Sequence, residues 1–166
     1  MYLETVRLRI RDLTEDDAEF VLRLVNDEAF IANIADKGIR DLEGARAFLR
    51  DGSWTNPKRP GHGMYALELR EAAGTTIGIG GILYREALDV TDVGYALLPE
   101  HRGYGYAFEA AEAMVAYGHS TLGVEHIVGL TAPNNTASIR TLEKLGMTYD
   151  RDVKMSEDDP GTALYS

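Results

Sequence analysis

The stretch PEHRGYGYAF, from Pro99 to Phe108, places an arginine ahead of small residues and leads directly into an alanine-rich segment. Small residues let a backbone approach another group closely, and a strand that turns tightly into a helix points several backbone N–H groups at one spot. The helix dipole adds partial positive charge there. The turn therefore predicts an anion site suited to phosphate, with Arg102 contributing a fixed positive charge nearby.

The spacing of the small residues excludes the two commonest phosphate motifs. No Gly-Lys-Ser/Thr follows the turn, as a Walker A motif requires, and the third glycine of G-x-G-x-x-G is replaced by Phe108. The pattern that remains is Arg-x-x-Gly-x-Ala, carried by Arg102, Gly105 and Ala107. A second glycine run, GIGG at 78–81, fits neither motif, and we expect it to let a strand bend or another backbone approach.

Hydrophobic periodicity predicts the elements that must position this turn, in the order β-α-α-β-β-β-α-β-α-β-β. Short turns between the early strands predict antiparallel pairing, whereas the later β-α-β segment is expected to be parallel. The expected fold class is a single α/β domain, residues 1–166, with a mixed α+β sheet. By residue number the expected elements are strand 3–12, a helix capped by Thr14, helix 42–50, loop 51–63, strands 64–70, 75–85 and 90–99, helix 106–122, strand 125–132, helix 134–146, and strands 147–155 and 162–166.

Charge and composition exclude several classes of protein. The chain has no cysteine, which removes disulfide scaffolds, thiolate nucleophiles and cysteine-based metal sites. A net charge of −10 argues against nucleic-acid partners and is compatible with a cationic substrate, although solubility is the stronger explanation of the charge. The start has no signal-peptide core, so we expect a cytoplasmic location and no membrane partner. The histidines show no metal spacing, and we expect no metal.

Two motifs together resemble the GNAT superfamily of acyl-CoA-dependent N-acyltransferases. The Arg-x-x-Gly-x-Ala turn is similar to its pyrophosphate loop, whose pattern is Gln/Arg-x-x-Gly-x-Gly/Ala. The stretch NNTASIRTLEKLGM is similar to Asn-x-x-Ser-x-x-x-x-Glu-Lys-x-Gly-Phe of the branch that acetylates protein N-termini, including ribosomal proteins, with Met147 in place of the aromatic residue. DVGYALLPEHRGYG and the opening ETVRLRIRDLTEDD also resemble that branch, so the likeness spans nearly the whole chain and implies the GNAT fold.

The resemblance implies that acetyl-CoA is the cosubstrate. In such enzymes the pantetheine arm lies where two parallel strands splay apart, bonded by the backbone of the strand before the loop, and the pyrophosphate meets the loop amides. Asn135 matches the family's asparagine on the pantetheine side, with helix capping as the alternative role. The cofactor-binding residues implied in this way are Tyr95, Ala96, Leu97, Leu98, Arg102, Gly103, Tyr104, Gly105, Tyr106, Ala107, Phe108 and Asn135.

The resemblance also implies two catalytic residues. Ser138 matches a serine placed near the acetyl-CoA sulfur, and it is the candidate, directly or through a water, to protonate the leaving thiolate; back-bonding within its own helix is the alternative. Many family members carry a tyrosine on this helix, where this chain has Leu142. Asp92 aligns with a position where many family members carry an acid and is the candidate base, although a solvated turn residue is the favoured alternative. Glu86 or water could take its place.

The implied reaction is direct attack of a primary amine, of a protein N-terminus or a small molecule, on acetyl-CoA in a ternary complex. The segments 33–40 and 53–65 are expected to select the acceptor, with Arg40, Trp54 and Tyr65 as possible lining residues. Homodimers are common in the family. Two other hypotheses stay open at this point: an acyl-CoA-binding sensor without turnover, and a nucleotide-binding protein that uses the same helix terminus.

Overall fold

The computed structural model describes residues 1–52 and 54–166. Its strands form one sheet in the order β1-β2-β3-β4-β5-β6-β8-β7. The strands are β1 (Tyr2–Glu4), β2 (Leu8–Arg11), β3 (Gly63–Leu69), β4 (Thr76–Arg85), β5 (Val90–Leu97), β6 (Ile127–Thr131), β7 (Tyr149–Val153) and β8 (Thr162–Tyr165). The helices are α1 (Ala18–Val25), α2 (Glu28–Asn33), α3 (Leu42–Arg50), α4 (Tyr106–Ser120) and α5 (Thr136–Lys144), with 3-10 turns at Glu15–Asp17 and Pro99–His101.

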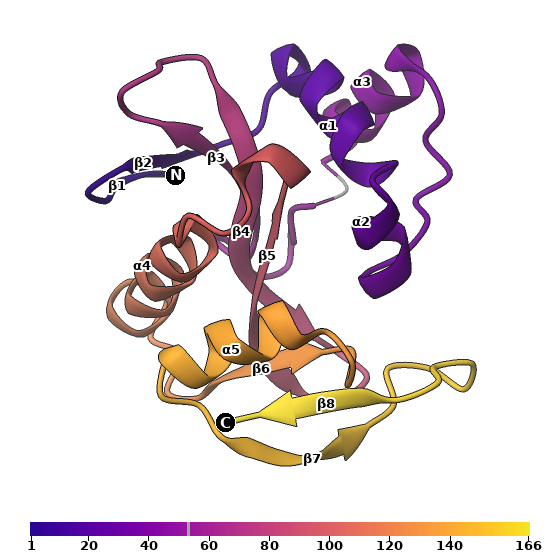
Figure 1. Ribbon diagram of the computed structural model, residues 1–166, viewed down its shortest axis with the longest axis vertical. Helices are drawn as coiled ribbons and strands as arrows, with labels where there is room; N and C mark the ends of the chain where they lie inside the picture. The colour runs from indigo at the N-terminus through magenta and orange to yellow at the C-terminus, as the bar shows by residue number, and fades with distance from the viewer. Residues whose placement is uncertain (53) are drawn as a thin grey trace.

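Helices cover both faces of the sheet. As Figure 1 shows, α4 lies on one side of the central strands, α1, α2 and α3 lie on the other, and α5 lies over β6. Each face has its own cluster of buried apolar side chains, one beneath α4 and one beneath α1 and α3. The strands β1 to β5 pair antiparallel and β5 pairs parallel with β6, so the predicted mixed sheet is confirmed.

The glycine run of β4 permits close backbone packing, as its sequence predicted. A Cβ at Gly78 would lie 2.4 Å from the carbonyl oxygen of Ala96, and one at Gly81 would lie 1.8 Å from that of Gly63. Contacts this short cannot be relieved by a side-chain rotation, because backbone atoms are involved. The glycines therefore hold β4 close to both of its neighbours, which fixes β5 in the centre of the sheet.

The predicted strand 3–12 is wrong in one respect, because it is a hairpin of two short strands. β1 pairs antiparallel with β2, and the residues between them form the turn. Alternation over 3–12 predicts Val6 on the face of Leu8 and Ile10, and Arg7 on that of Arg9 and Arg11. Val6 is instead 86% exposed, and both Val6 and Arg7 lie in the turn. The apolar and charged residues continue to alternate through the turn, so a period of two could not reveal the reversal. An additional short helix, α2, lies between the two helices that the sequence predicted in this part of the chain.

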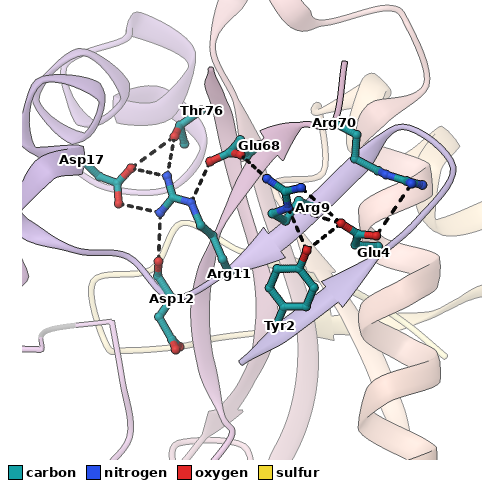
Figure 2. A network of polar contacts seen from close by, with 9 residues as sticks. All are labelled: Tyr2, Glu4, Arg9, Arg11, Asp12, Asp17, Glu68, Arg70 and Thr76. Carbon is teal, nitrogen blue, oxygen red and sulfur yellow. Dashed lines mark hydrogen bonds and ion pairs between the residues drawn. The ribbon is translucent and has the colours of Figure 1, made fainter. Parts of the chain in front are cut away.

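A continuous ion network covers the outer face of β1, β2 and β3 (Figure 2). Arg11 is its centre: it donates to Asp17 at 2.8 Å and to Glu68 at 2.9 Å, while Arg9 donates to the other oxygen of Glu68 at 3.0 Å. Asp17 also caps the backbone of Thr14, which starts the first helical turn as predicted. We call Arg9, Arg11, Asp17 and Glu68 the hairpin ion network. It joins the N-terminal hairpin to the start of α1.

Candidate functional site

The parallel ladder between β5 and β6 is short. Within the described residues its register pairs only Thr91 with Ile127 and Asp92 with Val128, although β5 continues to Leu97. Beyond Asp92 the two strands therefore separate, and one edge of β5 faces a gap rather than a neighbouring strand. This separation lies directly before the turn that leads into α4.

Backbone alternation identifies which groups of β5 face that gap. Leu98 donates its N–H to the carbonyl of Ile77 on the β4 side, at 2.9 Å. In an antiparallel pair the residues alternate in direction, so Ala96 also bonds toward β4, whereas Tyr95 and Leu97 direct their N–H groups toward the gap. Of the four β5 residues predicted to bind the pantetheine arm, Tyr95 and Leu97 thus offer the edge groups. The N–H groups of Ala96 and Leu98 are directed toward β4, away from the gap.

The turn before α4 is built on two glycines in the left-handed region. Gly103 has φ +82° and Gly105, which caps α4, has φ +83°. A Cβ at Gly103 would meet nothing within 4 Å, so the backbone conformation, rather than crowding, explains the glycine there. The first turn of α4 leaves its leading N–H groups without acceptors inside the helix. The geometry fits an anion held by main-chain donors.

The side chains around the turn divide into exposed and packed ones. Tyr104 is 64% exposed, whereas Tyr106 and Ala107 are half-buried against the core beneath α4. Phe108 lies under the ammonium of Lys144 from α5, with 4.7 Å between nitrogen and ring centroid. A contribution of the loop to anion binding therefore comes from its backbone, while these side chains pack it in place.

Arg102 is turned back onto the fold. Its guanidinium donates to the carbonyl of Leu97 at 2.9 and 3.1 Å and to the carboxylate of Asp27 at 2.5 Å. Asp27 in turn caps α2 by accepting from the N–H of Phe30. Arg102 therefore joins the end of β5 to the start of α2, and its charge beside the turn is shared with a carboxylate.

A residue that the sequence analysis did not select approaches the same turn. Arg7, in the hairpin between β1 and β2, donates to the carbonyl of Tyr104 at 2.7 Å and to the carboxylate of Glu109 at 2.6 Å. Its guanidinium also lies 4.4 Å from the ring centroid of Tyr106. Arg7 and Glu109 are 102 residues apart, so no local pattern could have indicated the contact.

Ser138 faces the β5 edge across the gap. The hydroxyl of Tyr95 donates to the carbonyl of Ser138 at 3.2 Å and lies 3.1 Å from its Oγ. Burial raises the pKa of Tyr95, so the phenol stays protonated at neutral pH. Leu142, one turn further along α5, is buried against Gly129 of β6. The structure thus brings Tyr95 and Ser138 together at the point where the strands separate.

Asn135 caps α5. Its side-chain oxygen accepts from the N–H of Ser138 at 3.2 Å, which is the alternative role that the sequence left open. The amide nitrogen of the same side chain is a separate donor, so the capping bond and a bond to a ligand are compatible.

Asp92 lies away from Ser138. It is 2% exposed and its carboxylate accepts from the Nε of Arg85 at 2.6 Å. Burial raises its pKa, and the charge of Arg85 opposes that shift. Asp92 and Tyr95 are three positions apart along β5, so their side chains point to opposite faces of the sheet. Glu86, the weaker candidate base, is exposed in the turn between β4 and β5.

The predicted acceptor-lining residues lie in two places. Trp54 and Tyr65 line one small cavity with Phe48 and Met64, and Trp54 packs edge-on against Phe48 at 4.8 Å. Arg40 is instead exposed and pairs with Asp36 at 2.6 Å. Ser53, at the start of the predicted segment 53–65, lies outside the described residues.

Among residues 1–52 and 54–166, no three His, Asp or Glu side chains lie together as metal ligands would. In that same part of the chain, no helix has both the length and the apolar character needed to cross a membrane.

Comparison with known proteins gives one family. A model described as "Acetyltransferase (GNAT) domain" matches residues 7–148. The curated protein YkkB of Bacillus subtilis, itself uncharacterized, is 31% identical over 157 residues, which is 92% of this chain and 88% of that protein.

Solved structures agree with the sheet and helix arrangement. An acetyltransferase from Agrobacterium tumefaciens matches with a TM-score of 0.79 at 26% identity, covering 99% of this chain and 92% of its own. RimL, a ribosomal L7/L12 alpha-N-protein acetyltransferase solved in complex with coenzyme A, matches with a TM-score of 0.79, covering 99% of this chain and 96% of its own. Because the identity to RimL is 17%, this second match shows a similarity of fold alone.

Proposed function

The chain belongs to the GNAT acetyltransferase family, and we propose that it moves an acetyl group from acetyl-CoA to a primary amine, by direct attack in a ternary complex. One observation carries this proposal. The β5–β6 ladder ends at Asp92, β5 continues to Leu97 with that edge unpaired, and a glycine turn then opens α4. A gap between parallel strands followed by a helix N-terminus matches a ligand with an extended amide-bearing arm and a diphosphate.

The β5 edge and the turn divide the binding of acetyl-CoA between them. Tyr95 and Leu97 offer main-chain groups that would bond the amides of the pantetheine arm as an additional strand does. The turn from Gly103 to Phe108 offers N–H groups and the positive end of the α4 dipole, which would hold the diphosphate. The amide nitrogen of Asn135 supplies one more donor on the pantetheine side.

Acetyl-CoA supplies the acetyl group as a thioester, in which the amine replaces the thiol. Ser138 is the candidate to give a proton to the leaving thiolate, because its hydroxyl lies at the gap and is oriented by Tyr95, 3.1 Å away. Leu142 is buried where many family members carry a tyrosine, so that group is absent from its usual helix position. The hydroxyl groups of Ser138 and Tyr95 lie close to this part of α5 and are the candidates to take over that role.

The amine must attack in its uncharged form, so a proton must be accepted. Asp92 remains the candidate, and because its carboxylate is 2% exposed it would act through water. Its bond to Arg85 limits its basicity. Water alone could take the proton, since positioning of two reactants supplies much of the rate in such a reaction.

The acceptor is proposed to be a primary amine at a protein N-terminus or on a small molecule. The likeness to RimL supports the first class, although it is a likeness of fold. The net charge of −10 is compatible with cationic acceptors of either class.

Release of free thiol from acetyl-CoA tests the proposal. The purified chain is incubated with acetyl-CoA and a panel of peptides with free N-termini, the same peptides with blocked N-termini, and small diamines and amino sugars. We expect thiol release only with free amines, and mass spectrometry should find one added acetyl group on the acceptor. Binding of acetyl-CoA without release from any acceptor would favour the sensor hypothesis. Greater thermal stabilisation by ATP than by acetyl-CoA would overturn the cosubstrate.

A further inference from the structure

We propose that Arg7 is a positioning residue for the cosubstrate turn: it fixes the Tyr104–Gly105 peptide, and it neutralises Glu109 beside the diphosphate site. This inference rests on the proposed function. It assigns a role in substrate binding to the hairpin between β1 and β2, which lies far from the turn in sequence.

The carboxylate of Glu109 is the anchor of this arrangement. It accepts from the Oγ1 of Thr5 at 2.5 Å, from the N–H of Arg7 at 2.7 Å and from the Nε of Arg7 at 2.6 Å. These bonds hold the pKa of Glu109 below its usual range against the opposing effect of burial. The carboxylate is 15% exposed, whereas the side chain of Arg7 is 42% exposed, so the pair lies at the surface with its acidic member covered. Glu109 therefore clamps both the backbone and the side chain of Arg7.

The clamped guanidinium then sets the direction of one loop peptide. Arg7 donates through its second nitrogen to the carbonyl of Tyr104 at 2.7 Å. A trans peptide is planar, so its carbonyl and the following N–H point in opposite directions. Fixing the carbonyl of Tyr104 on the Arg7 side therefore fixes the N–H of Gly105 on the opposite side of the turn, where the diphosphate would lie. Gly105 itself has φ +83° and no side chain, so the bond to Arg7 restrains a residue whose backbone is intrinsically free to rotate.

Charge gives a second reason for the contact. Glu109 lies in the first turn of α4, where the helix dipole stabilises a carboxylate, but the same carboxylate repels a bound anion. Arg7 places a positive charge on that carboxylate, so the diphosphate would meet a neutral pair. A Cβ built on Gly105 would be 3.3 Å from the Nη2 of Arg7, which shows how close the guanidinium comes to the turn.

The test is the dissociation constant of acetyl-CoA in the full chain, measured by calorimetry, with the KM and kcat of turnover. We expect Arg7→Ala to raise the dissociation constant and KM for acetyl-CoA by about tenfold, with kcat within about twofold. Arg7→Lys keeps the charge but loses the two-nitrogen geometry, so it should restore part of the affinity. The double variant Arg7→Ala/Glu109→Gln removes the uncompensated carboxylate and should bind more tightly than Arg7→Ala.

Arg23→Ala is the matched control, since Arg23 forms an exposed ion pair with Glu100 at 2.7 Å. It should leave both constants unchanged. Unchanged affinity in Arg7→Ala and Arg7→Lys, with normal binding by the unaltered chain, would overturn this inference alone. Failure of the unaltered chain to bind acetyl-CoA would overturn the proposed function instead. A loss of unfolding free energy in Arg7→Ala without any change in affinity would assign Arg7 to stability only.

Discussion

The hairpin ion network and the β5 edge differ in whether their polar groups find hydrogen-bond partners within the chain. On the face of β1 to β3, Arg9, Arg11, Asp17 and Glu68 satisfy one another at 2.8–3.0 Å. At the other region, β5 runs on past Asp92 paired with β4 alone, so its opposite edge has no paired strand among the described residues, and the turn after it directs N–H groups outward. The first region completes its bonds within the chain and so adds stability. The second keeps bonding capacity for a ligand.

This contrast predicts that substitutions in the two regions change different quantities. Changes at the hairpin ion network should lower the free energy of unfolding and leave the KM for acetyl-CoA alone. Changes at the β5 edge and its turn should alter binding or turnover in a chain that stays folded.

The largest expected effect is loss of acetyl-CoA binding in Gly105→Glu. The substitution adds a negative charge to the anion site and forces a side chain into φ +83°, with its Cβ 3.3 Å from Arg7. We expect the dissociation constant to rise by about 100-fold or more, since charge repulsion and strain act together. Calorimetry measures the binding, and circular dichroism checks the fold.

Gly74→Glu is the matched control for that variant. Gly74 has φ +85° and open space around it, in the turn between β3 and β4. The Gly74→Glu variant has the same change of charge and the same backbone strain as Gly105→Glu, but at a position away from the site. If both variants lose binding equally, the effect is strain in the fold rather than a blocked anion site.

The next effect is on stability, in Arg11→Ala. The substitution leaves Asp17 and Glu68, each 5% exposed, without their shared partner. Removing one member of a buried ion network should lower the free energy of unfolding by about 2–3 kcal/mol. Urea unfolding measures this loss. The KM for acetyl-CoA of the folded variant should match that of the unaltered chain, and a raised KM would break the division between the two regions.

Ser138→Ala should have a smaller effect and only on turnover. It removes the hydroxyl 3.1 Å from Tyr95 but keeps the backbone that α5 and Asn135 use. We expect kcat to fall by about tenfold with the dissociation constant of acetyl-CoA nearly unchanged. Steady-state kinetics with a saturating amine provides the measurement, and Glu143→Ala, at an exposed position of the same helix, is the control. An unaltered kcat would remove Ser138 from the mechanism.

The smallest effect is the response of stability to acid. The partners of Asp17 and Glu68 hold both pKa values below the usual range. A depressed pKa gives stability that is complete above the unfolded pKa, near 4, and is lost as the pH falls through the folded pKa. We therefore expect the free energy of unfolding to fall by about 1 kcal/mol or more between pH 5 and pH 3.

Asp92 should oppose this acid response, because burial raises its pKa. The cost of its buried charge is present above the folded pKa and is relieved as the carboxylate becomes protonated. In Asp92→Asn that relief is absent, so the acid-induced loss measured by urea unfolding should become steeper. A shallower loss would mean that the bond to Arg85 outweighs burial.

The sequence predicted the central part of the fold well because its signals there are local. Strand, glycine turn and helix follow one another from Val90 to Ser120, and α3 has the predicted bounds Leu42–Arg50. The paired motifs also identified the family. Gly103 and Gly105 were predicted at the turn, and the structure adds the reason, which is their positive φ.

What the sequence did not reveal depends on contacts between distant segments. The bond between Tyr95 and Ser138 joins residues 43 positions apart, and Arg7 meets Glu109 across the sheet. Alternation made Arg7 resemble a solvent-facing strand residue, because the reversal of the hairpin changes no local periodicity. The burial of Asp92 was equally hidden, since an acid at a strand entry is usually solvated.

The two-pair parallel ladder has a mechanical consequence for the whole sheet. The first five strands contact the remaining three, β6, β8 and β7, through this two-pair ladder and through helix packing. A substrate arm bound along β5 would bridge β5 and β6 beyond Asp92 and so extend the contact between the two strands. Amide hydrogens of β6 and β8 should then exchange with solvent more slowly when acetyl-CoA is bound, so the enzyme is structurally completed by the molecule it consumes.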